Sequence, residues 1–105
     1  MNDRAREILA TAGLQGHPQI RKTWHTDKGE CALGVLHLAC HATREEALQC
    51  YNARQNNHEY NNFSEIREMF DLSWPELRQI WTANDNGWDF LTIARKIGVP
   101  EETNV

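Results

Sequence analysis

The segment that decides the fold is the most apolar run of the chain, Cys31-Ala32-Leu33-Gly34-Val35-Leu36-His37-Leu38-Ala39-Cys40-His41. Apolar residues occupy most positions of its helical period, so the run predicts a central, buried helix that begins at Cys31. Its clearly polar stripe consists of Gly34, His37 and His41. The rest of the chain is therefore expected to supply the elements that cover this helix.

Upstream of the central helix, the sequence predicts one helix and then an extended stretch. Asp3 is placed to cap the first helix, and Gly13 is placed where that helix should end. The apolar residues on one face of this helix are Ala5, Ile8, Leu9 and Ala12. Residues 20–26, followed by the turn residues 27–29, predict a strand and turn, which allows a short N-terminal β-hairpin.

Downstream, the sequence alternates helix-start signals with turns. Residues 43–46 (Thr-Arg-Glu-Glu) and 73–76 (Ser-Trp-Pro-Glu) both have the pattern of a capped helix start. Ser64 is placed to cap a short helix between them. Asn84 and Asp85 precede Gly87, and we expect their side-chain oxygens to cap the final helix.

These elements predict a single all-α domain over residues 1–105, with about five to six short helices in addition to the hairpin. A chain of this length supports one modest core. Trp81 and Trp88 both occupy core-like positions. The side chains expected to be mostly buried around the central helix are Leu33, Leu36, Leu48, Tyr51, Ile80, Trp81, Phe90 and Ile93.

Composition and charge restrict the function. The formal net charge is −4, so free nucleic acid is a poor partner because the chain has no excess of cations to replace counterions. The sequence contains no apolar run of membrane-spanning length and no leader-like start, so we expect a cytoplasmic protein without a membrane partner. The three cysteines are consistent with a reducing compartment. No cofactor is expected.

The residues from Trp88 to Pro100 have the pattern of the first half of a helix-turn-helix. In that motif a recognition helix follows the turn and reads the DNA. Residues 101–105 are too few and too acidic to form such a helix. The pattern therefore counts against simple DNA binding, and a DNA-associated regulator is kept only as an alternative function.

Two blocks of sequence resemble a known group of proteins. The first block is Trp24, Gly29 and residues 31–36 (Cys-Ala-Leu-Gly-Val-Leu), and the second is residues 84–87 (Asn-Asp-Asn-Gly) followed by Phe90, Ile93 and Ala94. Together they resemble small uncharacterised proteins of phages and bacteria that share a domain of unknown function. The resemblance spans roughly residues 24–98 and implies a phage or bacterial setting and a compact helical fold. It implies no specific activity.

Cys31 is the candidate catalytic residue. A thiol at a helix N-terminus can have a lowered pKa, and His25 with Asn84 or Asp85 would complete a Cys-His-Asn type of nucleophile site. The structural alternative is a small buried residue that caps a core helix.

His37 and His41 are weak candidates for metal ligands. Their spacing of four residues places both side chains on one helical face, as in zinc-binding helices. Position 38 is Leu, so the general-base Glu of a His-Glu-x-x-His motif is absent, and Cys31 or His25 would have to complete the site. The structural alternative is the polar stripe of a buried helix.

The candidate binding residues are aromatic and polar. The Asn-rich residues 52–62 predict a polar loop, and the loop with its flank combines amides with amphipathic side chains, a mixture suited to an interface. The candidate binding residues are Tyr51, Arg54, His58 and Tyr60, together with Trp24 and Trp74 as exposed anchors or core lids.

The sequence therefore favours a small non-enzymatic module that binds a protein. The phage-like resemblance suggests an accessory or counter-defence inhibitor. The alternatives are a cysteine- or metal-dependent enzyme that uses Cys31 with histidines, a DNA-associated regulator, and a homo-oligomeric structural protein.

Overall fold

The computed structural model describes residues 1–54 and 62–97, and this part of the chain forms six helices and one two-stranded hairpin. The elements are α1 (Asp3–Leu14), β1 (His25–Thr26), β2 (Gly29–Glu30), α2 (Ala32–Leu38), α3 (Arg44–Arg54), α4 (Asn62–Phe70), α5 (Trp74–Asp85) and α6 (Phe90–Lys96). The prediction of an essentially all-α fold with a short N-terminal hairpin is confirmed. Among the described residues, no helix is both long and apolar enough to cross a membrane.

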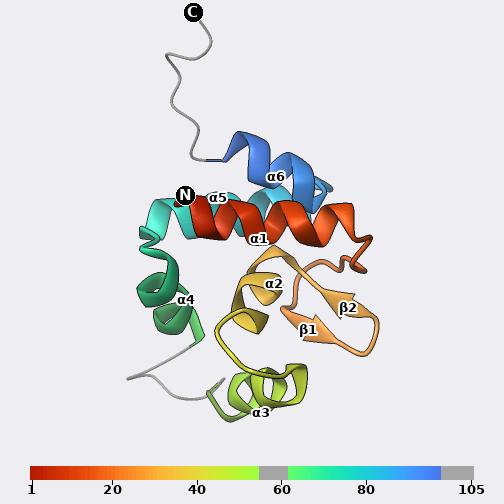
Figure 1. The fold of residues 1–105 in the computed structure, drawn as a ribbon, viewed down its shortest axis with the longest axis vertical. Coiled ribbons are helices and arrows are strands. Elements are labelled where there is room, and N and C mark those ends of the chain that lie inside the picture. Colours follow the sequence, from red (N-terminus) through yellow and green to blue (C-terminus); the bar gives the residue numbers. More distant parts are fainter. Residues whose placement is uncertain (55–61, 98–105) are drawn as a thin grey trace, which may run out of the picture.

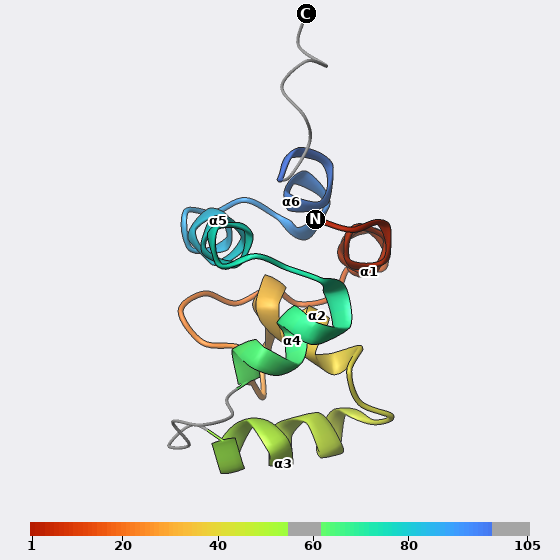
Figure 2. The ribbon, with the colours of Figure 1, turned by 90° about the vertical axis from the view of Figure 1, so that its left-hand side faces the viewer.

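The helix α2 lies at the centre of the fold, as its apolar sequence predicts. Figures 1 and 2 show α1, α5 and α6 on one side of α2 and α3 on the opposite side. The helix contacts α1, α3, α4 and α5, and α1 packs along α6. Because α2 is covered from several directions, all of residues 32–37 are buried.

The core contains most of the residues expected there. Those confirmed as buried, each at most 2% exposed, are Leu33, Leu36, Ile80, Phe90 and Ile93. Leu48, Tyr51 and Trp81 are only partly buried. Leu48 and Tyr51 belong to α3, which lies at one end of the molecule and of whose described side chains only Ala47 is completely buried. The expectation for Trp88 is wrong, because its side chain is 37% exposed in the turn before α6.

Two helix starts follow the predicted capping chemistry. Ser73 and Glu76 form a reciprocal capping box at the start of α5. The hydroxyl of Thr43 accepts a hydrogen bond of 3.1 Å from the backbone N–H of Glu46 at the start of α3. Both caps satisfy N–H groups that have no partner within their own helix.

Three capping predictions are wrong by a few residues. The side chain that caps α1 belongs to Asn2 rather than Asp3. Ser64 lies inside α4, which already begins at Asn62. The cap of α6 is Asp89, whose carboxylate accepts from the backbone N–H of Thr92, so Asn84 and Asp85 have other roles. Several short polar residues stand near each of these starts, and tertiary packing decides which of them takes the cap position.

The hairpin is shorter than the extended stretch predicted for residues 20–26. Its strands pair antiparallel, with His25 opposite Glu30 and Thr26 opposite Gly29. Lys22 has a φ of 68°, a left-handed conformation that interrupts an extended strand. The hairpin therefore begins only at His25, and it places the side chains of His25 and Glu30 in the interior beside α2.

Candidate functional site

A cluster of ionisable side chains, which we call the histidine network, lies beside α2. Its members come from separate elements: His25 from β1, Glu30 from β2, His37 from the last turn of α2, His41 from the α2–α3 connection and Glu65 from α4. His25, Glu30 and His37 are at most 7% exposed. Buried polar groups of this kind require partners, and the network supplies them.

The hydrogen bonds of the network define which ring nitrogens carry protons. The Nδ1 of His25 lies 3.1 Å from Oε2 of Glu30, and its Nε2 lies 2.9 Å from Nδ1 of His37. A carboxylate only accepts, so Nδ1–H of His25 donates to Glu30. Burial lowers the pKa of His25 below its usual 6.5, which favours the neutral ring. Its Nε2 then accepts from Nδ1–H of His37, and the Nε2 of His37 faces the opposite side.

That opposite side is occupied by Glu65 and His41. The Nε2 of His37 lies 3.4 Å from Oε2 of Glu65, and the Nε2 of His41 lies 2.5 Å from Oε1 of Glu65. The side chains of His41 and Glu65 are 8% and 14% exposed, so this end of the network reaches the surface. Two imidazoles from the α2 region and one carboxylate from α4 therefore converge just beneath the surface, with both Nε2 atoms buried.

Glu30 closes the buried end of the network. Its carboxylate accepts from Nε2 of His17 at 2.6 Å, from Nη2 of Arg44 at 2.9 Å and from His25. Burial by itself raises the pKa of Glu30, but the hydrogen bonds from His17, His25 and Arg44 outweigh burial and hold this pKa below its usual value of 4.5. Glu30 is therefore charged at neutral pH and holds His25 in place.

We expect Glu30→Gln to lower the free energy of unfolding by about 2–3 kcal/mol at pH 7, because hydrogen bonds to a charged group contribute about 1.5–3 kcal/mol. The folded-state pKa of Glu30 is lowered, so its contribution is present above pH 4.5 and is lost as pH falls through the folded-state value. Urea denaturation at pH 7 and pH 3.5 should therefore show the difference between wild type and variant shrinking at low pH. The exposed Glu45→Gln on α3 is the control, and a Glu30 variant as stable as this control at pH 7 would contradict the assignment.

The structure places a third potential metal-binding side chain beside His37 and His41, and it is not one that the sequence analysis proposed. Neither Cys31 nor His25 joins the two histidines as a third ligand. Glu65 is instead the third residue whose potential ligand atom lies near the pair, because α4 packs beside α2. Glu65 was missed because no sequence spacing connects it to His41 across the intervening helix α3. The one sequence feature that bears on its position is the apolar face of its helix, which has to pack against the central helix.

Cys31 has a capping role in the described structure. Its side chain is buried, and Sγ accepts from the backbone N–H of Gly34 at 3.4 Å. Burial raises the pKa of Cys31 to about 11, so the thiol is protonated at neutral pH despite its position at a helix start. His25 uses both of its ring nitrogens on Glu30 and His37. These contacts favour the structural interpretation of Cys31 over the nucleophilic one.

Asn84 also serves the structure rather than a catalytic site. It lies at the end of α5 with only 1% of its surface exposed. Its Oδ1 accepts from the backbone N–H of Ala32 at 2.9 Å and from the side chain of Gln19 at 2.8 Å, and its Nδ2 donates to the carbonyl oxygen of Ile20 at 2.8 Å. Asn84 therefore ties α5 to the start of α2 and to the segment before the hairpin.

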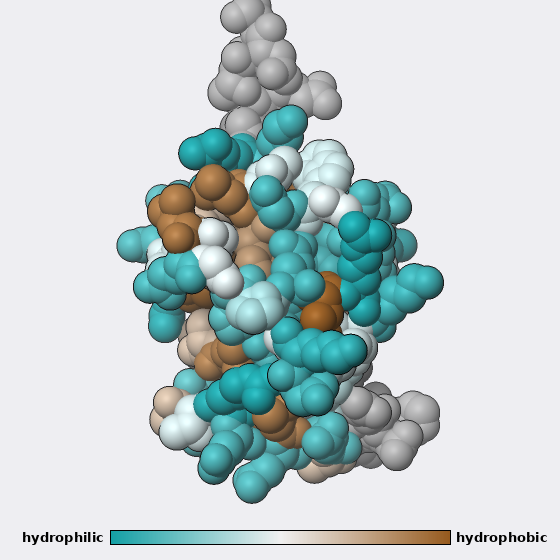
Figure 3. Space-filling view, turned by 90° about the vertical axis from the view of Figure 1, so that its right-hand side faces the viewer, coloured by the Kyte–Doolittle hydropathy of each residue, from teal (hydrophilic) through white to brown (hydrophobic). Residues whose placement is uncertain are grey.

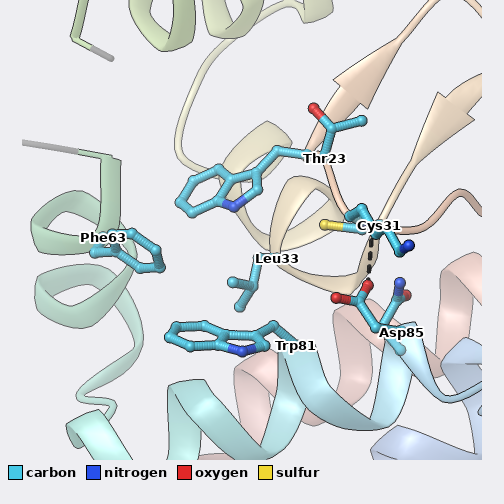
Figure 4. Close-up of a pocket in the computed structure, with 9 residues that line it drawn as sticks. Thr23, Cys31, Leu33, Phe63, Trp81 and Asp85 are labelled. Carbon is cyan, nitrogen blue, oxygen red and sulfur yellow. Dashed lines mark hydrogen bonds between the residues drawn. The ribbon is translucent and has the colours of Figure 1, made fainter. Parts of the chain in front are cut away.

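A second feature, which we call the aromatic pocket, lies between α2, α4 and α5 (Figure 4). It encloses about 220 Å³, and its lining residues are Lys22, Thr23, Trp24, Cys31, Leu33, Phe63, Trp81, Asn84 and Asp85. Figure 4 shows Leu33, Phe63 and Trp81 around the same part of the pocket, where the ring centroids of Phe63 and Trp81 are 5.6 Å apart. The backbone N–H of Lys22 donates to the carboxylate of Asp85 at 2.9 Å, which closes the polar side of the pocket.

The predicted binding residues fall into three groups. Trp24 is buried, lines the aromatic pocket, and stacks on Tyr51 with ring centroids 5.4 Å apart. Trp74 is 42% exposed, as expected of an anchor, and its ring lies 5.7 Å from that of Phe63. The backbone of Arg54 ends α3. Three further predicted binding groups lie outside the described part of the chain: the side chain of Arg54, and all of His58 and Tyr60.

The face of the molecule on the hairpin side mixes hydrophobic and hydrophilic areas. Figure 3 shows small hydrophobic patches there, separated by hydrophilic residues. Large apolar patches are the usual mark of an obligate interface. On this face, therefore, the surface does not favour extensive hydrophobic docking.

Comparisons of the chain with models of protein families, with curated proteins and with solved structures found no match. The resemblance to small phage and bacterial proteins thus remains a prediction from the sequence. The histidine network and the aromatic pocket are therefore the features of this chain that bear on its function.

Proposed function

We propose that this protein is a non-enzymatic protein-binding module that receives one large apolar side chain of its partner in the aromatic pocket. The observation that carries the proposal is the pocket itself. Its volume of about 220 Å³ is below the roughly 300–1,000 Å³ typical of small-molecule and cofactor sites. A single Leu, Met or Phe side chain is a better match for this volume than a cofactor or an extended substrate.

The pocket walls have the chemistry of an interface hot spot. Such spots combine buried aromatic surface with a polar rim that excludes water. Trp24 and Phe63 pack edge to face with centroids 5.2 Å apart, and Phe63 packs against Trp81 at 5.6 Å. Lys22 and Asp85 stand at the polar side and can hydrogen-bond the partner's backbone.

The aromatic surface continues from the pocket to the exposed Trp74. Phe63 contacts both Trp81 and Trp74, and the guanidinium of Arg67 lies 4.7 Å from the centroid of the Trp74 ring. Phe63 also follows the Asn-rich residues 52–62 closely in the chain. This continuity supports an interface that includes Tyr51, Trp74 and the Asn-rich segment as well as the pocket.

The other function classes have less support. The raised pKa of Cys31 and the occupied ring of His25 disfavour a cysteine enzyme. The net charge of −4 disfavours a DNA-associated regulator. With the resemblance to phage and bacterial proteins, the proposal extends to a cytoplasmic accessory or counter-defence inhibitor. A second copy of the chain is the competing occupant of the pocket.

A peptide-display selection with the purified protein tests the proposal. We expect the selected peptides to share one large apolar residue, and Trp81→Ala to weaken their binding at least tenfold because it removes a pocket wall. Trp88→Ala is the matched control, since Trp88 is exposed outside the pocket. A combined Arg54→Ala, His58→Ala and Tyr60→Ala variant tests the Asn-rich segment.

Three results would count against this function. Equal binding by wild type and Trp81→Ala would exclude the pocket, and sedimentation showing a dimer that Trp81→Ala dissociates would make a second copy the occupant. If a folded Cys31→Ala variant lost a measured activity while the pocket and segment variants bound normally, the enzyme alternative would replace the proposal.

A further inference from the structure

We propose that His37, His41 and Glu65 form a binding site for one divalent transition-metal ion of the zinc class. The three side chains each place one ligand atom within 4.8 Å of the others. The site lies beside the aromatic pocket and shares Trp24 with it, because the Trp24 ring packs edge-on against His37 at 5.5 Å. Metal binding does not depend on the partner binding proposed above.

One distance in the cluster equals the ligand–ligand separation of a tetrahedral ion. Two ligands bound to zinc at about 2.0–2.2 Å lie about 3.4 Å apart. Oε2 of Glu65 and Nε2 of His37 are separated by 3.4 Å. Oε1 of Glu65 and Nε2 of His41 are 2.5 Å apart but lie outside hydrogen-bond geometry, so a small rotation of the partly exposed Glu65 or His41 would bring both onto one ion.

The donor set suits such an ion chemically. Two neutral imidazoles and one carboxylate are the protein ligands of open zinc sites and of other divalent transition-metal sites. Within the described residues, no fourth His, Cys, Asp or Glu belongs to the group. A water molecule or a partner group would complete the coordination.

The surroundings of both histidines support the same assignment. Ligating histidines usually direct the second ring N–H to an acceptor, which orients the ring toward the metal. The Nδ1–H of His37 donates to His25, which in turn donates to Glu30. The Nδ1 of His41 lies 3.6 Å from Oε1 of Glu46. Both rings therefore direct Nε2 to Glu65, and the ring of His37 is also held by an outer acceptor at Nδ1.

Titration of the metal-free full-length chain with Co²⁺ and Zn²⁺ tests the site. We expect one Co²⁺ per chain with the intense visible absorption of a four-coordinate ion, displaced by Zn²⁺. Zinc at about 100 times its dissociation constant should raise Tm by about 10 °C or more, since the ion binds only the folded chain. Glu65→Gln and, separately, His41→Gln should weaken metal binding at least tenfold. Glu68→Gln, an exposed change on the same helix, should bind as wild type does.

Three outcomes would overturn the proposal. One is the absence of a 1:1 complex and of any Tm shift with zinc. Another is metal binding that Glu65→Gln and His41→Gln leave unchanged, which would place the ion elsewhere. The third is a Glu65→Gln variant that lowers Tm of the metal-free chain while zinc has no effect on wild type. That result would make the cluster a proton-linked ion pair.

Discussion

Gly34→Ala should lower the free energy of unfolding by more than about 4 kcal/mol, although alanine is the better helix former by about 1 kcal/mol. A Cβ at position 34 would overlap the carbonyl oxygen of Trp24 and would stand 2.9 Å from the carbonyl carbon and 3.1 Å from Cβ of Glu30. That carbonyl cannot easily retreat, because it accepts a hydrogen bond of 3.1 Å from the backbone N–H of Cys31. The added methyl must therefore displace α2 from the hairpin.

Chemical denaturation of wild type, Gly34→Ala and Gly16→Ala measures this effect. A Cβ added at Gly16 would meet nothing within 4 Å, but this residue has a φ of +71°, so its substitution should cost only the strain of a left-handed residue, about 1–2 kcal/mol. A Gly34→Ala variant more stable than wild type would mean that α2 does not approach the hairpin as closely as described.

Leu36→Ala should cost about 2–5 kcal/mol, the range observed when a core leucine is truncated. Leu36 is 0% exposed in the middle of α2, and this helix is packed against by α1, α3, α4 and α5. The surroundings are therefore held from several sides and cannot collapse into the cavity, which favours the upper half of the range. Leu14→Ala is the matched control, because Leu14 is 75% exposed.

Thermal and urea denaturation would measure both leucine variants. We expect a lower midpoint for Leu36→Ala without a change in the denaturant slope, and a change within about 0.5 kcal/mol for Leu14→Ala. Equal stabilities of the two variants would contradict the central position of α2.

The two proposed sites depend on the same helix. Leu33 of α2 lines the aromatic pocket, and His37, one turn later, belongs to the histidine network. Trp24 contacts both, since it lines the pocket and packs against His37. A variant that displaces α2 should impair both sites, whereas Trp81→Ala and Glu65→Gln should each affect only one.

The sequence by itself determined the structural features that depend only on residues close together in the chain. The apolar period of residues 32–37 predicted the buried central helix, and the Ser73–Glu76 pattern predicted the start of α5, because helix faces and caps operate within one or two turns. The spacing of His37 and His41 likewise predicted that their two rings lie near each other. The ring centroids are 4.9 Å apart, although α2 ends at Leu38 and His41 lies in the connection that follows it.

Tertiary structure alone decided which distant residues meet. It brought Glu65 to the histidine pair, buried Glu30 beneath His17, His25 and Arg44, and raised the pKa of Cys31. It also left Trp88 exposed although its position suggested the core. These outcomes depend on how helices pack and on how much water that packing excludes. A local pattern carries no information on contacts between residues that lie tens of positions apart in the chain.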